Sequence, residues 1–239
     1  MYKYLSLISI AGLLTLASCD EGRIYNDDIV QTEEGGTARF VGNVSGTGTW
    51  SAGYTLALAG FDEGNDYALI SKNIETSLSG SKCDLTLSGI PSEVTRIELC
   101  AIDRLRRRVA TFLSADFSRQ EGTLMMEAEH IDLSMAAAIQ SEIFNTTCAQ
   151  CHGGTGHAAA GLTLLEGYSF SNLISVPSVK IPGMDRVKPG SSAESELFLI
   201  LDSDLSADWN YDHSVEVVRQ EKLDLIRNWI DSGADILSE

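Results

Sequence analysis

Hydrophobic and polar residues alternate with a period of two over the first half of the chain, from Thr37 to about His130. Gly, Asn, Asp, Ser and Pro residues separate the alternating runs. Runs of this kind between turn-forming residues predict short β-strands. The clearest runs read TARFVGNV, YTLALAGF, DYALIS, CDLTLSGI, RIELCAID and RRVATFL.

After His130 the hydrophobic positions recur with helical spacing. The residues that fall close to one helical face are Ile131, Met135, Ile139, Ile143 and Phe144. Ser134 stands where the N-cap of this helix is expected. Two later stretches, AESELFLILDS and QEKLDLIRNWIDSGADI, predict further helices, and Gly233 lies at the C-cap position of the second.

These two patterns predict a fold class of two domains. Residues 37–130 are expected to form an all-β antiparallel sandwich of immunoglobulin or fibronectin-III type, because many short strands with regular turn signals suit that architecture. Residues 131–239 are expected to form a small all-α domain with long irregular links. A domain this small tolerates such links better if something large fills its core.

The N-terminus predicts export. Lys3 precedes an apolar run from Leu5 to Leu16, and small residues then lead to Cys19. The run is too short for a transmembrane helix and is typical of a secretory signal, here residues 1–18. If this segment is an ordinary signal peptide, Cys19 follows it by chance.

The ending Leu16-Ala17-Ser18-Cys19 resembles the lipobox of bacterial lipoproteins. The resemblance implies cleavage before Cys19 and attachment of lipid to it, followed by an acidic tether over residues 19–36. The chain is then expected on the periplasmic or surface side of the bacterial cell envelope, anchored to membrane lipid through Cys19 without spanning the membrane.

The balance of acidic and basic residues indicates which classes of binding partner are expected. There are 34 acidic and 17 basic residues, and the formal net charge is −17. Nucleic-acid binding needs clustered Lys and Arg and is not expected. An excess of acidic residues commonly serves only to keep a protein soluble. It would also attract a basic redox partner protein by long-range electrostatics. The basic run Arg104–Arg108 is either a solvated turn or strand face or a partner-docking patch.

Five cysteines are present, and export favours their oxidation or modification. Cys83 and Cys100 are left over if Cys19 takes lipid and the Cys148–Cys151 pair takes a cofactor. They are candidates for a disulfide by parity, or equally for buried free thiols, since both lie in strand-like runs.

The segment NTTCAQCHGG holds Cys148, Cys151 and His152 in the spacing CxxCH. A redox dithiol belongs at a strand-to-helix turn, which the pattern does not predict here. A structural zinc site pairs ligands from two separated knuckles, and no second CxxC or HxxxH is present. The spacing matches covalent attachment of one haem c, with Cys148 and Cys151 as thioether anchors and His152 as the proximal iron ligand.

Four segments resemble a known family. IFNTTCAQCHGG, GLTLLEGYSFSNLI, RVKPGSSAESELFLIL and LIRNWIDSGA are similar, in this order, to the motifs of planctomycete-type cytochrome c domains. The resemblance covers nearly all of residues 131–239. It implies a cytochrome c-like haem domain over these residues.

The family's Met-Pro pair before the last helix, whose methionine is the expected second axial ligand, has no counterpart here. His213 lies close to that position and is the leading candidate for the distal iron ligand. Met184, in a loop bearing proline and glycine, is the rival, and His157 is a weaker option. Bis-histidine ligation would lower the reduction potential, because Met/His ligation raises it.

The sequence therefore predicts a membrane-anchored mono-haem c-type cytochrome that carries electrons. No distal acid–base pair is obvious, so a catalyst is less expected than an electron carrier. The alternatives are a peroxidase-like enzyme or a subunit of an exported oxidoreductase. A third alternative is a surface lipoprotein binding module with a degenerate haem domain.

Overall fold

The structure is a computed structural model and describes residues 35–75, 80–118, 122–154, 156, 158–205 and 211–236. The predicted signal sequence and Cys19 lie outside these residues. Residues Gly35–Glu239 form one compact unit. The boundary expected between residues 130 and 131 stays a prediction. None of the helices in the described ranges has the length and apolar character needed to cross a membrane.

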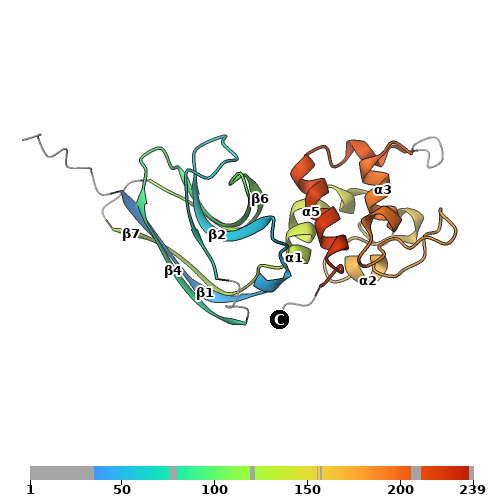
Figure 1. Cartoon of the computed structure of the whole chain (residues 1–239), viewed down its shortest axis with the longest axis horizontal. Coiled ribbons are helices and arrows are strands. Elements are labelled where there is room, and N and C mark those ends of the chain that lie inside the picture. Colours follow the sequence, from blue (N-terminus) through green and yellow to red (C-terminus); the bar gives the residue numbers. More distant parts are fainter. Residues whose placement is uncertain are drawn as a thin grey trace, which may run out of the picture. The chain divides into compact units, whose positions relative to one another are not determined.

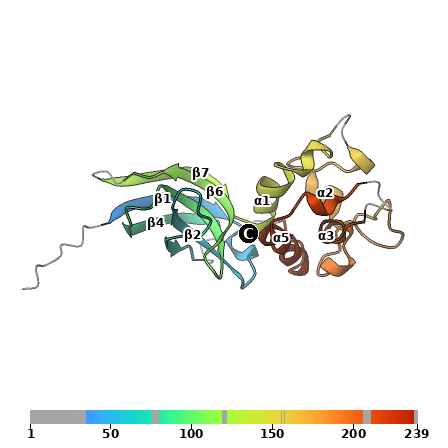
Figure 2. The same cartoon turned by 90° about the horizontal axis from the view of Figure 1, so that it is seen from above.

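The period-two runs form strands, as expected. The strands of the described part are β1 (Gly36–Ser45), β2 (Tyr54–Phe61), β3 (Ile70–Asn73), β4 (Ser81–Ile90), β5 (Arg96–Asp103), β6 (Arg108–Asp116) and β7 (Thr123–Asp132). They build a three-stranded sheet of order β4-β1-β7 and a four-stranded sheet of order β3-β2-β5-β6 (Figure 1). Neighbouring strands are antiparallel except β1 and β7, which pair in parallel and run alongside each other in Figure 2.

One hydrophobic core takes side chains from both sheets and from the helices. Phe40 of β1 and Leu58 of β2 are fully buried in it, and so is Ile139 of the helical half. Every second residue of β1 from Ala38 faces this core. The alternating pattern is therefore the reason that this segment is a strand rather than a helix.

The two leftover cysteines are free thiols. Cys83 lies on β4 and Cys100 on β5, in different sheets. Cys100 packs in a separate apolar cluster with Ala57, Ala59 and Phe61, whereas Cys83 belongs to the main core. The disulfide that parity suggested is therefore not formed, and both residues are buried free thiols.

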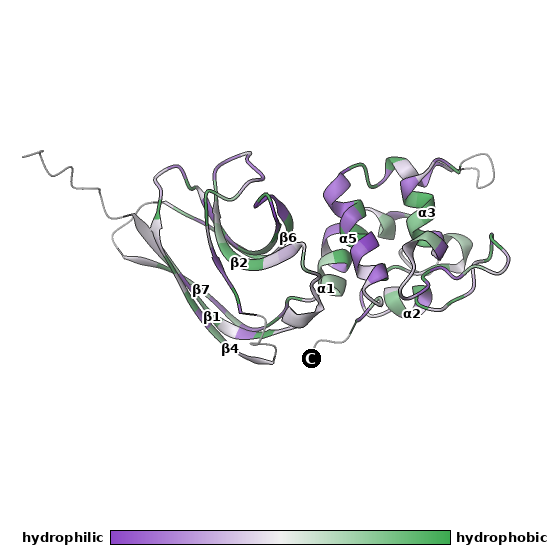
Figure 3. Cartoon of the chain, viewed as in Figure 1, coloured by the Kyte–Doolittle hydropathy of each residue, from purple (hydrophilic) through white to green (hydrophobic). Residues whose placement is uncertain are grey.

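The helices are short and joined by long links. The α-helices of the described part are α1 (Met135–Ile139), α2 (Ser169–Leu173), α3 (Glu196–Asp202) and α5 (Gln220–Asp231). Single turns of other helix types lie at Thr47–Thr49, Gln140–Phe144, Cys148–Gln150, Ala159–Gly161, Ser192–Glu194 and His213–Val215. Figure 3 shows that α3 is largely hydrophobic, in keeping with its buried Leu197, Phe198 and Leu201.

The predicted fold class is wrong. The structure is mostly β, with 36% of the described residues in strands or isolated β-bridges and 26% in helical conformations. The helices of the described residues are four and short, and no all-α cytochrome c-like domain is visible among them. The predicted sandwich is also not wholly antiparallel, because β1 and β7 run in parallel.

The spacing of apolar residues predicted helices that are too long. This spacing does not show where the backbone hydrogen bonds change from the α-helical to another pattern. Ser134 does cap α1, since its hydroxyl accepts from the Ala137 amide at 3.1 Å. The ladder then widens, and the Asn145 amide bonds the Gln140 carbonyl five residues back at 2.9 Å. The expected helix over this region is therefore a five-residue helix followed by a π-turn.

Two arginines of the basic run, Arg107 and Arg108, form ion pairs within the protein, whereas Arg104 and Arg106 are exposed. Arg108 bridges Glu98 at 2.5 Å and Asp66 at 2.7 Å, and Arg107 bridges Asp103 and Glu221 at 3.3 Å each. These residues join the β5–β6 turn to the start of α5. This arrangement fits the turn-and-strand interpretation and leaves Arg107 and Arg108 paired inside the protein instead of facing a partner.

Candidate haem-attachment pocket

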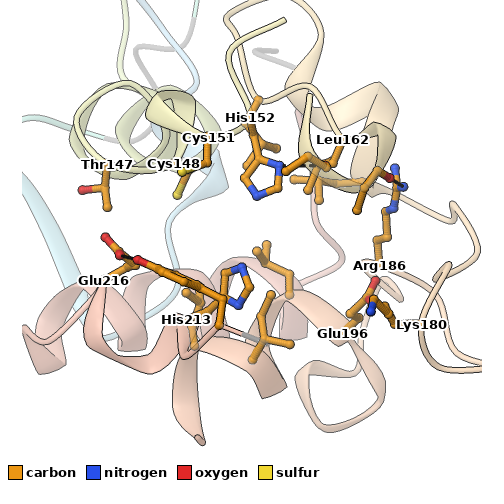
Figure 4. Close-up of a pocket in the computed structure, with 18 of the residues that line it drawn as sticks. Thr147, Cys148, Cys151, His152, Leu162, Lys180, Arg186, Glu196, His213 and Glu216 are labelled. Atoms are coloured by element: carbon orange, nitrogen blue, oxygen red, sulfur yellow. Dashed lines mark hydrogen bonds between the residues drawn. The ribbon is translucent and has the colours of Figure 1, made fainter. Parts of the chain in front are cut away.

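The CxxCH segment forms a tight helical turn. The amides of Cys151 and His152 both donate to the Cys148 carbonyl, at 3.2 and 2.9 Å. Residues three apart in a 3₁₀ turn are eclipsed, so the Cys148 and Cys151 side chains extend from the same side of the turn. Figure 4 shows the two side chains next to each other at the pocket wall.

Gly153 is required for the chain to leave this turn. A Cβ at this position would lie 2.2 Å from the carbonyl oxygen of Ala149, far inside van der Waals contact. Only glycine lacks the Cβ, so the backbone can double back directly after His152. The glycine after the motif therefore has a steric role in presenting the histidine.

One ring nitrogen of His152 is fixed by the backbone. Its Nδ1 lies 3.1 Å from the carbonyl oxygen of Ala159. A carbonyl can only accept, so Nδ1 carries the proton and the lone pair is on Nε2. Burial, the largest effect, lowers the pKa of His152; hydrogen bonds to the backbone at Ala159 and Leu162 raise it, and the nearby His213 and Arg186 lower it. An imidazole that carries its proton on one ring nitrogen ligates a metal through the other.

A cavity of about 500 Å³ lies beside this motif, and Cys148, Cys151 and His152 line it. Its apolar wall is formed by Leu162, Leu164, Leu173, Leu197, Ile200 and Leu201. Pockets for drug-sized and cofactor-sized molecules span roughly 300–1,000 Å³ and are mostly apolar with a few polar groups. The cavity therefore has the size and lining of a cofactor pocket.

His213 lies across the cavity from His152. Figure 4 shows the two imidazoles directed toward the same space from opposite walls. The turn that carries His213 is capped by Asp212, whose carboxylate accepts from the Ser214 amide at 2.9 Å. The Tyr211 ring packs edge-on against the imidazole, with 5.0 Å between centroids, and its hydroxyl donates to Glu216.

The Cys148 thiol is held in its protonated form. Burial raises its pKa to about 12, and the Glu216 carboxylate raises it further. Thioredoxin-like dithiols depend on a thiol whose pKa is lowered, so this environment does not suit dithiol redox chemistry.

The donor set does not suit zinc. Across the described ranges, from which His157 is absent, no three His, Cys, Asp or Glu side chains come close enough together to hold a metal ion. Zinc needs at least three protein ligands. A haem iron needs only axial ligands, and the residues around this cavity match that smaller requirement.

The remaining candidates are placed differently. Met184 is not among the residues that line the cavity, and His157 lies outside the described residues. The sequence interpretation missed Arg186, Tyr211 and Glu216, which do line it. Arg186 precedes the V-x-P-G segment, but its place in the pocket depends on carbonyl groups far away in sequence.

Comparisons with protein-family models, curated proteins and solved structures found no match.

Proposed function

We propose that this chain is a c-type haem protein that carries electrons. Cys148 and Cys151 would hold one haem c through thioether bonds, and His152 would be its proximal ligand. His213 would ligate the iron from the other face. The haem would supply an iron that accepts and releases one electron.

The observation that carries the proposal is the pairing of His152 and His213 across one apolar cavity that also exposes both cysteine side chains. The four residues come from segments more than sixty positions apart. Each has the chemistry that covalent haem requires, because thiols form the thioethers and neutral imidazoles ligate the iron. The lowered pKa of His152 and the contact of its Nδ1 with the Ala159 carbonyl support the same assignment.

Electron transfer is favoured over catalysis by the second imidazole. A haem with a protein ligand on both faces offers no coordination position to peroxide or a gas. Bis-histidine ligation also favours a lower reduction potential than Met/His ligation. We further propose that the chain is exported and anchored in the bacterial cell envelope by lipid on Cys19. There it would exchange electrons with a partner protein.

The test is expression of the full chain together with a cytochrome c maturation system. We expect a pyridine haemochrome spectrum with one covalently bound haem per chain. The Cys148→Ala/Cys151→Ala variant is the matched control and should lose the covalent haem. A chain that carries no covalent haem under these conditions would exclude the proposal.

A further inference from the structure

Arg186 is a buried cation for which the described residues offer no carboxylate partner. Its exposed fraction is 8%. The guanidinium donates to the carbonyl of Asn172 at 2.9 Å and to that of Ala160 at 3.3 Å. Neutral carbonyls satisfy only part of its five-donor fork, and among the described residues no acidic side chain forms an ion pair with it.

Two other buried charges of the described residues lie in ion pairs. Glu98 is 1% exposed and contacts Arg108, and Glu221 is 5% exposed and contacts Arg107. Removing a charge from water without an opposite charge costs several kcal/mol, on the order of the penalty for breaking a buried pair. Arg186 is the buried cation of the described residues that has no such pair, and it lies at the wall of the cavity, as does the buried Glu196.

The surroundings of Arg186 are mixed in charge. Lys180 and Glu196 line the same end of the cavity in Figure 4, opposite the end that holds Cys148 and Cys151. Glu196 accepts from the Ser178 hydroxyl at 2.6 Å, so its carboxylate already has a donor. Arg186 and Lys180 are the two basic side chains that line this end of the cavity.

We propose that Arg186, with Lys180 beside it, forms a subsite for the carboxylate groups of the molecule that fills the cavity. The inference rests on the proposed function, under which these groups are the two propionates of the haem. A guanidinium presents parallel N–H donors that match a carboxylate in a bidentate arrangement. The cysteines hold one edge of the ligand and Arg186 its anionic edge, so the pocket accepts the macrocycle in one orientation.

The experiment compares an acid with its ester. The full chain carrying Cys148→Ala and Cys151→Ala serves as the parent, and we expect it to bind haem reversibly. It is titrated with ferric protoporphyrin IX and, separately, with its dimethyl ester, and binding is followed by Soret absorbance. We expect the parent to bind the diacid about tenfold more tightly or better, the effect of one charge-assisted hydrogen bond. Arg186→Gln in this parent should bring the ratio close to one.

Arg96→Gln is the matched control, since it removes one positive charge from an exposed pair with Asp116 on strands β5 and β6. It should leave the ratio unchanged. If Arg186→Gln does not fold, Arg186→Lys takes its place. It keeps the charge and loses the fork, so the ratio falls part of the way. An unchanged ratio in the folded Arg186 variant overturns the subsite.

A second readout uses the covalently loaded chain. A cation beside the haem stabilises the more negative reduced state, so Arg186→Gln should lower the reduction potential and Arg96→Gln should not. Covalent haem in the unmodified chain tests the proposed function by itself. If haem attaches but the acid and ester bind the parent equally, the subsite alone is wrong. If no haem attaches, the proposed function fails as well.

Discussion

The two imidazoles of the pocket are held in different ways. His152 is fixed through its ring, because Nδ1 bonds the Ala159 carbonyl, and its backbone carbonyl accepts from the Leu164 amide at 2.8 Å. His213 sits on a single capped turn with Tyr211 against its ring. A side chain on a single short turn is the easier of the two to exchange by mutation, since little of the core depends on it.

Replacement of His213 by methionine should therefore raise the reduction potential of the loaded chain. The physical reason is that a thioether in place of imidazole stabilises the reduced iron. The measurement is a spectroscopic redox titration of the haem, together with the low-spin or high-spin character of its absorption spectrum. His213→Ala should leave the oxidised haem high-spin.

Met184→Leu is the control for this prediction. Met184 is absent from the lining of the cavity and is half-buried elsewhere, so leucine should change neither the potential nor the spin state. The reverse pattern, in which Met184→Leu alters the spectrum and His213→Ala does not, would assign the second face to Met184.

For individual residues, the sequence identified candidate site residues where they lie close together in the chain. The CxxCH spacing is contained in five residues, and the turn that they form follows from that spacing. Arg186 could not be identified, because its partners Asn172 and Ala160 come from helix α2 and from the separate turn Ala159–Gly161. The opposition of His213 to His152 was a prediction from position in the chain, and only the folded links bring the two rings to one cavity.

Among the elements, the 3₁₀ turn of the CxxCH motif is sterically constrained, because Gly153 leaves no room for a side chain. Gly153→Ala would force the new methyl group against the Ala149 carbonyl oxygen. We expect a lower yield of covalent haem, since the cysteines and His152 move apart. The pyridine haemochrome per mole of purified protein measures the effect.

Gly48 offers a matched comparison, because a Cβ there would meet no atom within 4 Å. Gly48→Ala introduces the same methyl group in another short turn, and it should leave haem yield unchanged. Equal yields from the two alanine variants would mean that the steric argument for Gly153 is wrong.

The β5–β6 pair carries a buried ion pair whose loss should be costly. Arg108→Met leaves the Glu98 carboxylate buried without its cation, and removal of one partner of a buried pair costs about 3–5 kcal/mol. Urea unfolding followed by circular dichroism gives the change in the free energy of unfolding. A second substitution, Glu98→Gln, removes the stranded charge and should recover part of the loss.

Arg96→Met is the control for this pair. Its partner Asp116 is almost fully exposed and 3.9 Å away, and an exposed pair contributes about 1 kcal/mol or less. Similar losses from Arg96→Met and Arg108→Met would contradict the assignment of a buried pair.

Some of the secondary structure could be predicted from the sequence, and some of it could not. Period-two alternation located the strands because burial on one face of a sheet acts at every second residue, as at Ala38 and Phe40 of β1. The parallel pairing of β1 with β7 escaped prediction, because the two strands are joined only after five others. The helical half was predicted as longer helices, since apolar spacing continues across the π-turn at Gln140–Phe144.

For the whole molecule, the net charge of −17 determines which charged molecules its electric field attracts. Acidic groups also flank the cavity itself, where Glu216 lines the wall and Asp212 caps the turn of His213. A negative field attracts cations and repels anions over roughly a Debye length, about 30 Å at 0.01 M salt and about 10 Å at 0.1 M. Attraction of a basic partner should therefore be strongest at low ionic strength.

The rates of electron exchange with small charged reagents test the effect of this electric field, and they do not require the partner protein to be known. Hexaammineruthenium, a cation, should react faster with the loaded chain at low salt and slow down as salt is added. Ferricyanide, an anion, should show the opposite dependence. Stopped-flow absorbance of the haem gives both rate constants, and a neutral quinone is the control that should respond little to salt. Rates that change with salt in the same direction for cation and anion would show that the acidic excess does not steer reactants to the haem.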